Sequence, residues 1–329
     1  MTQSTIFPKK LKRGSHIRII APSRSASILT KELINHSKAR LEEFGFKISF
    51  GKNIYESDDF SSSSVASRIA DLHDAYKDKD VDAILTVIGG YNANQILDEI
   101  DYNLIENNPK ILCGFSDITT LSNAIYAQTQ VATYSGPHFS SWGMKKEFEY
   151  SIKSFKKALM SDAPYDLEPS STWSDDMWFI DQNNRKLNKN KGLLVIQEGE
   201  AQGRIVGGHA RCLSSLQGTK YWPSLEDTIL FIEEDEETSA ELFDRLVQSF
   251  IHQSGFNGVK GIVVGRFQNN SKVSDDTLRQ IFESKKALKD IPIIANANFG
   301  HTTPIGTFPV GGEAKIIASK QPAITILSH

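Results

Sequence analysis

The segment "KILCGFSDITTLSNAI", residues 110–125, contains the first side chains that could do chemistry. An apolar run ends at Gly114, and a helical pattern starts directly after Asp117. Ser116 would then stand on a sharp strand-to-helix turn, which exposes a serine hydroxyl above a sheet and places the next backbone N–H to bind an oxyanion. The hydrolase elbow pattern has a second glycine where this sequence has Ile118. Ser116 or Asp117 could equally be the polar cap of an ordinary helix, so this segment leaves both hypotheses open.

A nucleophilic serine needs a general base, and His301 is the best candidate among the eight histidines. It follows a buried strand in "NANFGHTTPIGTFPVGG", and loops on a rigid scaffold often carry catalytic groups. His138 and His209 also lie in predicted loops and remain alternatives. The other histidines are expected on ordinary strand or helix faces or at the C-terminus; they are His16, His36, His73, His252 and His329.

The carboxylate that would orient the base is expected in "TILFIEEDEE". Glu233 directly follows five apolar residues, so it should be partly buried and able to hold an imidazole. Glu234 is the alternative acid, one residue on. Glu236 and Glu237 are better explained as negative charge near the start of the helix at Ser239, where such charge is favourable.

Motifs for metals and nucleotides are weak in this sequence. There is no His-Glu-x-x-His pair, Gly89-Gly90 lacks the glycine spacing of a dinucleotide site, and no Gly-Lys-Ser/Thr phosphate loop occurs. We therefore expect no metal and no cofactor. Two rivals to a serine hydrolase are a metal hydrolase using His209, His301 and Glu233, and a non-catalytic protein that binds a small ligand at Gly89-Gly90.

Length and charge limit the class of protein. The 329 residues exceed the usual size of one hydrophobic core, which predicts two domains. A net charge of −3 argues against binding to nucleic acid polymers, and two cysteines are too few for a disulfide framework. No stretch reaches the roughly 20 apolar residues that cross a bilayer, and the segment after the basic N-terminus is too short and polar for a signal peptide. We expect a cytoplasmic protein without a membrane partner.

The first half alternates apolar strands with amphipathic helices. This pattern predicts an α/β domain over 1–160, with a parallel, Rossmann- or flavodoxin-like sheet covered on both faces. Ligands bind such sheets at the carboxyl ends of the strands, where Gly89-Gly90 and Ser116 lie. The expected strands are 16–23, which ends in a Pro/Ser loop, 47–51, 81–90, which ends in two glycines, and 110–116. The expected helices are 30–45, 63–78, 92–100, which Asn92 would cap, and the one after Asp117.

The second half is rich in short strands. Six candidates between 192 and 329 and one long helix from Ser239 to Gly255 predict a β-rich, partly barrel-like domain over 192–329. Between the halves, 161–191 is polar and reads as a linker or a substrate loop. Its aromatic residues, Trp173, Trp178 and Phe179 among them, favour a functional loop.

Several blocks together resemble the LD-carboxypeptidase family of serine peptidases. They are the opening from Gly14 to Ser23, "IGGYNANQIL", "CGFSDITTL", "GGHARCLSSLQGTKYWPSLEDTILFIEEDEE" and "FGHTTPIGTFPVGG", in the family's order. The resemblance implies a catalytic triad in which Ser116 is the nucleophile, Glu233 the orienting acid and His301 the base. The first half of the chain thus carries the nucleophile, and the second half carries the acid and the base. It also implies an oxyanion hole made by the N–H groups of Gly90 and Asp117. The family's elbow reads Ser-Asp, so Ile118 is a lesser objection, and Asp117 could cap the helix. His209 departs from the family, which more often has asparagine there.

The family has two branches. One removes the terminal D-alanine of murein tetrapeptides in cell-wall recycling, and the other resembles the microcin C immunity peptidase, which cleaves an acidic aminoacyl group from a modified nucleotide. The segments "TWSDDMWFIDQ" and "YSGPHFSSWGM" look like the second branch. A small aminoacyl-nucleotide or peptide is therefore the expected partner, with Trp178 or Trp173 stacking on the base. Packing of these tryptophans onto the sheet is the competing explanation. The resemblance alone implies a homodimer.

Overall fold

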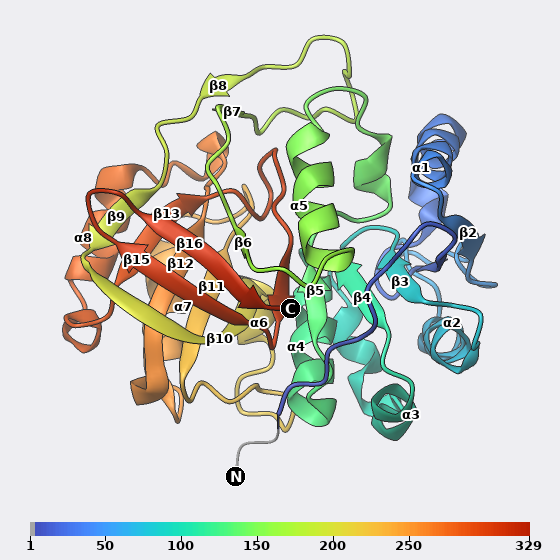
Figure 1. Ribbon diagram of the computed structural model, residues 1–329, viewed down its shortest axis with the longest axis horizontal. Coiled ribbons are helices and arrows are strands. Elements are labelled where there is room, and N and C mark those ends of the chain that lie inside the picture. Colours follow the sequence, from blue (N-terminus) through green and yellow to red (C-terminus); the bar gives the residue numbers. More distant parts are fainter. Residues whose placement is uncertain (1–3) are drawn as a thin grey trace.

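The computed structural model describes residues 4–329 and contains two large sheets side by side (Figure 1). The first sheet has the order β14-β5-β4-β3-β1-β2, and its first-half strands run parallel in the flavodoxin-like order 2-1-3-4-5. The predicted α/β class is confirmed. Its strands are β1 (His16–Ile20), β2 (Lys47–Phe50), β3 (Ala83–Thr86), β4 (Ile111–Gly114), β5 (Thr133–Ser135) and β14 (Phe308–Val310).

Helices connect the parallel strands. The side chain of Thr30 caps α1 by accepting from the N–H of Leu33, and Ser64 caps α2 in the same way. The predicted helix over 92–100 is a 3-10 helix, η2 (Ala93–Glu99), and Asn92 does not cap it because its side chain bonds Ser62 instead. The helical segments of this half are η1 (Ala26–Ile28), α1 (Lys31–Glu43), α2 (Val65–Lys77), α3 (Tyr102–Asn107), α4 (Ile118–Thr129), η3 (Ser140–Gly143) and α5 (Glu149–Leu159).

The second sheet has eight strands in the order β6-β16-β15-β10-β11-β12-β13-β9, of which β10 to β13 run parallel. Its end strands β6 and β9 do not pair, so within the described residues the sheet is open. The β-rich prediction is confirmed, while "partly barrel-like" is corrected to an open mixed sheet. Its strands are β6 (Tyr165–Asp166), β9 (Leu194–Gln197), β10 (Gly199–His209), β11 (Thr228–Glu233), β12 (Val259–Gly265), β13 (Ile293–Ala297), β15 (Glu313–Ala318) and β16 (Ala323–Ser328).

Shorter elements complete the second half. The long predicted helix is α7 (Ala240–Ile251), capped by the Ser239 side chain. The segment 161–191 is not a bare linker, because it contributes β6 to the second sheet and forms its own ribbon from β7 (Thr172–Trp173) and β8 (Asn188–Lys189). The remaining helical segments are α6 (Ala210–Ser214), η4 (Phe256–Gly258), η5 (Asn269–Ser271), α8 (Asp275–Glu283) and η6 (Lys286–Leu288). No helix among residues 4–329 is long and apolar enough to cross a membrane.

The halves share a core. β14 comes from the second half of the chain but pairs antiparallel with β5, at the edge of the first sheet. Its Phe308 packs on Phe231 and Phe299, with ring centroids 4.8 and 5.1 Å apart. The domain limits 1–160, 161–191 and 192–329 remain predictions, and residues 1–3 of the first lie outside the described residues.

The end of β10 lies directly against α4. Asn123 of α4 accepts from the Gly207 N–H at 3.1 Å and donates to the Gly207 carbonyl at 2.9 Å. The His209 N–H donates to Thr119 Oγ1 at 2.9 Å. At Gly208, with φ of 131°, an added Cβ would lie 2.4 Å from Thr119 Oγ1. Only glycine permits this approach, which fixes the first turn of α4 relative to the ends of β10 and β11.

Replacing this glycine should therefore separate the two elements. We expect Gly208→Ala to lower the free energy of unfolding by about 2–4 kcal/mol, from backbone strain together with overpacking. The control is Gly218→Ala, which also has positive φ (75°) but meets nothing within 4 Å; it should cost about 1 kcal/mol. If chemical denaturation showed the same loss of unfolding free energy for both variants, the close contact of Gly208 with α4 would not contribute to stability.

Candidate active site

Ser116 stands on a strained turn between β4 and α4. Its φ is 59°, in the left-handed region that residues other than glycine rarely adopt. Space for the turn comes from Gly89, where a Cβ would lie 2.8 Å from the Ser116 Cβ. The turn thus has the strained geometry of a strand-to-helix elbow, although position 118 is isoleucine.

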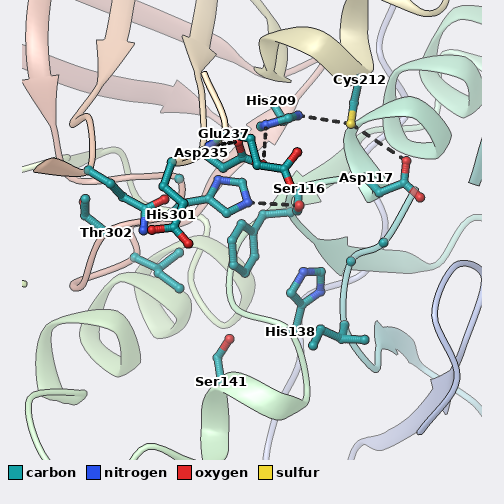
Figure 2. A pocket seen from close by; sticks show the side chains of 18 of the residues that line it. Ser116, Asp117, His138, Ser141, His209, Cys212, Asp235, Glu237, His301 and Thr302 are labelled. Carbon is teal, nitrogen blue, oxygen red and sulfur yellow. Dashed lines mark hydrogen bonds and ion pairs between the residues drawn. The ribbon is translucent and has the colours of Figure 1, made fainter. Parts of the chain in front are cut away.

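Ser116, His301 and Glu233 form one hydrogen-bonded series. His301 Nε2 lies 3.0 Å from Ser116 Oγ, and His301 Nδ1 lies 2.8 Å from Glu233 Oε2. An ionised carboxylate only accepts, so Nδ1 carries the proton and Nε2 of a neutral ring is free to accept from the serine. Figure 2 shows the His301 ring pointing at Ser116 across the cavity.

Glu233 is the last residue of β11 and only 2 % exposed. Close packing at Gly300, where a Cβ would lie 2.4 Å from Oε2, holds its carboxyl group. Burial alone raises the pKa of Glu233, but the charge and hydrogen bond of His301 and the charge of His209 outweigh it, so the pKa is lowered. Glu233 is therefore ionised beside the imidazole.

Glu234 faces away from His301. Its carboxylate accepts from the Arg211 N–H at 2.7 Å and from the Arg211 guanidinium at 2.9 Å. The alternation of side chains along a strand explains the difference, because successive residues point to opposite faces. Of the two glutamates considered from the sequence, the structure brings Glu233 to the imidazole.

Asp117 does not cap α4 with its side chain, although the sequence allowed this possibility. Its Oδ2 accepts instead from Ser23 Oγ at 2.5 Å and from the Ala93 N–H at 2.9 Å, which ties the turn to the loops after β1 and β3. Among residues 4–329, the backbone N–H groups of Gly90 and Asp117 donate to no protein acceptor. Both donors predicted for the oxyanion hole are thus available to a ligand.

His209 belongs to a polar network that was not predicted. It is 4 % exposed; its Nδ1 lies 3.1 Å from Cys212 Sγ and its Nε2 lies 3.6 Å from Asp235 Oδ2. Although burial lowers the pKa of an imidazole, Asp235 and Cys212 raise the pKa of His209 well above its ordinary value. The centroid of its ring is 5.1 Å from that of His301. The sequence pointed to this site only through the histidine in "GGHARC". Its contact with Asp235 depends on tertiary packing, which no local pattern shows.

His138, the other alternative base, is buried behind the site. Its Nδ1 bonds Thr86 Oγ1 at 2.9 Å, and its ring stacks on Phe115 with centroids 4.2 Å apart. Burial, helped by the charge of His301, lowers the pKa of His138 to about 3. It is therefore neutral and does not contact Ser116 through a hydrogen bond.

The hydroxyl of Ser116 opens on a cavity of about 570 Å³ between the two sheets. Trp178 lines this cavity, whereas Trp173 lines a separate, smaller one and lies under Arg266. Of the two tryptophans, Trp178 is thus the one that lines the cavity of Ser116, and its contact with a substrate stays a prediction. The loop that carries it is tied to the His301 loop, because Ser174 and Thr303 exchange backbone hydrogen bonds of 2.8 and 2.7 Å.

Comparisons with known proteins match both halves of the chain to one family. Residues 17–136 match the LD-carboxypeptidase N-terminal domain, and residues 202–316 match the LD-carboxypeptidase C-terminal domain. YocD of Bacillus subtilis (strain 168) is 50 % identical over 313 residues, 95 % of this chain and 96 % of that protein. The microcin C7 self-immunity protein MccF of Escherichia coli is 28 % identical over 312 residues, 91 % of this chain and 89 % of that protein.

Solved structures are similar over nearly the whole chain. An MccF-like protein from Bacillus anthracis has a TM-score of 0.97 and 51 % identity, covering 99 % of this chain and 100 % of that one. MccF in complex with glutamyl sulfamoyl guanosine has a TM-score of 0.88 and 27 % identity, covering 98 % of each chain.

The environment of His209 predicts a measurable titration. We expect its imidazole, followed by NMR, to titrate above the ordinary histidine value of 6.5. The pKa should fall in Asp235→Asn, because the neutral amide no longer favours the cation. Since the pKa is higher in the folded chain, the protonated ring stabilises the fold below pH 6.5, and this stabilisation is lost as the pH rises through the folded-state pKa. If the pKa of His209 were at or below 6.5 and did not change in Asp235→Asn, the pairing of His209 with Asp235 would be contradicted.

Proposed function

Because this chain belongs to the LD-carboxypeptidase family, we propose that it is a serine-type amide hydrolase with Ser116 as nucleophile, His301 as base and Glu233 as orienting acid. The observation that carries the proposal is the unbroken series of hydrogen bonds, 3.0 Å from Ser116 to His301 and 2.8 Å from His301 to Glu233. It begins at a strained serine on the wall of a cavity large enough for a small-molecule substrate.

In the first step Ser116 Oγ attacks the substrate carbonyl while His301 Nε2 takes the serine proton. Glu233 stabilises the imidazolium that forms and keeps Nδ1 as the donor. The N–H groups of Gly90 and Asp117 would hold the oxyanion of the tetrahedral intermediate. His301 then protonates the leaving amine, and water, activated by the same ring, releases the acyl group from the serine.

For the substrate we propose a small aminoacyl-nucleotide with an acidic aminoacyl group. Structures of the similar MccF contain glutamyl sulfamoyl guanosine and aspartyl sulfamoyl adenosine. Trp178 on the cavity wall supplies an aromatic surface for the base. Arg24 lines the cavity beside Gly90 and makes no ion pair among the described residues, whereas Arg211 is engaged by Glu234 and its neighbours. The Arg24 guanidinium, which lies over the Tyr91 ring at 4.9 Å from its centroid, would thus be the cation that receives an acidic group.

The alternative substrate is a murein tetrapeptide. It is favoured by the relation to the murein tetrapeptide carboxypeptidase of Pseudomonas aeruginosa, which is 21 % identical over 308 residues, 91 % of this chain and 92 % of that protein. We also retain as proposals the homodimer, the cytoplasmic location and the division of the chain at 160/161 and 191/192.

Covalent labelling tests the nucleophile. We expect a fluorophosphonate to label the wild-type chain once, and Ser116→Ala to lose both labelling and hydrolysis, because among residues 4–329 no other hydroxyl is hydrogen-bonded to His301. The matched control is Ser141→Ala, which removes a hydroxyl from the wall of the same cavity and should label as the wild type does. A wild type that does not label, or a Ser116→Ala variant that labels equally well, would favour a non-catalytic binding protein.

A direct comparison of turnover tests the substrate. We expect aspartyl sulfamoyl adenosine to be hydrolysed in preference to a murein tetrapeptide. Trp178→Ala should weaken binding of the nucleotide substrate by about 5- to 150-fold, equivalent to the roughly 1–3 kcal/mol of one stacked base. Trp178→Phe should retain most of the affinity, and Trp173→Ala should have no effect because that ring lines another cavity. Preference for the tetrapeptide would overturn the nucleotide assignment.

A further inference from the structure

Three side chains that can bind a metal meet on one wall of the cavity. His209 ends β10, Asp235 follows β11 and His301 follows β13 (Figure 2). Each offers one ligand atom, and the three atoms lie within 4.8 Å of one another. Separate strands of a rigid sheet therefore bring together two imidazoles and one carboxylate.

His209 is the least explained member of this trio. It is 4 % exposed, yet its Nε2 has no hydrogen-bond partner among the described residues and lies 3.6 Å from Asp235 Oδ2. A buried imidazole nitrogen normally has a hydrogen-bond partner. A metal cation that replaced the Nε2 proton, which Asp235 otherwise favours, would bind both ligand atoms and release that proton.

Both imidazoles are already oriented by a second contact. His209 Nδ1 is held by Cys212 Sγ at 3.1 Å, and His301 Nδ1 is held by Glu233 at 2.8 Å. Histidines that bind metals commonly have their other ring nitrogen fixed in this way, which sets the orientation of the ring and raises its basicity.

The ligand types select zinc over the harder cations. Zn²⁺ accepts two imidazole nitrogens and one carboxylate oxygen at about 2.0–2.2 Å, which places tetrahedral ligand atoms about 3.3 Å apart. The 3.6 Å between His209 Nε2 and Asp235 Oδ2 is close to that spacing. All three ligand atoms lie within 4.8 Å of one another, so rotation of the side chains would bring them to the distances that zinc requires. Mg²⁺ and Ca²⁺ prefer oxygen ligands and fit this set poorly.

We propose that His209, Asp235 and His301 form a Zn²⁺ site, and that zinc bound there inhibits the enzyme instead of assisting it. Coordination through either nitrogen of His301 breaks the series of hydrogen bonds, since Nε2 meets Ser116 and Nδ1 meets Glu233. Ser116 would then keep its proton and remain a poor nucleophile. The inhibitory effect rests on the proposed function, whereas binding of the metal does not.

Binding is tested directly by titrating Zn²⁺ into the full, chelator-treated chain in a calorimeter, with the Co²⁺ absorption spectrum as a second probe. We expect one zinc per chain, and at least tenfold weaker binding in Asp235→Asn and in His209→Gln. Glu236→Gln is the matched control, because that carboxylate lies on the same cavity but bonds Asn270 and is outside the trio. Thermal unfolding of each variant checks that it is folded.

The effect on Ser116 is measured by the rate of fluorophosphonate labelling with and without Zn²⁺, each variant being compared with its own zinc-free rate. We expect zinc to slow labelling of the wild type at least tenfold, reversibly on adding a chelator, and to leave Asp235→Asn unaffected at the same concentration. Undiminished zinc binding by folded Asp235→Asn and His209→Gln would overturn the site. Faster labelling with zinc, or hydrolysis that stops on chelation, would overturn the inhibitory role. A wild type that never labels would refute the proposed function, and calorimetry would still decide the site.

Discussion

The relative positions of Ser116, His209 and Glu233 follow from the direct contact between β10 and α4. No side chain separates the backbone of Gly207 and Gly208 from the helix, and Asn123 bonds both the N–H and the carbonyl of Gly207. Ser116 lies two residues before the start of this helix, and the register of the second sheet pairs His209 with Glu233. The distance between serine and glutamate is therefore set by the close contact of β10 with α4, in which the buried side chains of Asn123 and Thr119 bond the backbone of the strand.

Electrostatics gives different properties to three histidines that line one cavity. His138 is buried, with its Nδ1 bonded to the neutral hydroxyl of Thr86, and it stays neutral because burial lowers its pKa to about 3. His209 is equally buried but lies next to Asp235, which favours its cation. His301 is more exposed and shares its Nδ1 with the ionised Glu233. Of these three histidines, only His301 is hydrogen-bonded to Ser116. Its side chain is also partly exposed to the cavity.

The sequence predicted the parts of the molecule that depend on local pattern. Apolar strands followed by helices predicted the parallel sheet, and the position of Glu233 at the end of an apolar run predicted its burial. Features set by distant contacts were missed or wrong. The Asp117 side chain, which the sequence allowed as a cap of α4, reaches Ser23 across 94 positions of the chain. The contacts of His209 with Asp235 and Cys212, the transfer of β14 to the first sheet and the different cavities of the two tryptophans likewise have no local signal.

The crossing of the chain after His301 has a mechanical consequence. β13 anchors the start of the His301 loop in the second sheet, and β14 anchors its end in the first, where it pairs with β5. The loop is thus a short tether attached to both bodies. Any shear between the sheets would strain this loop, and dividing the chain into two separately produced halves would remove an edge strand from the first sheet. This loop therefore couples the movements of the two sheets at His301.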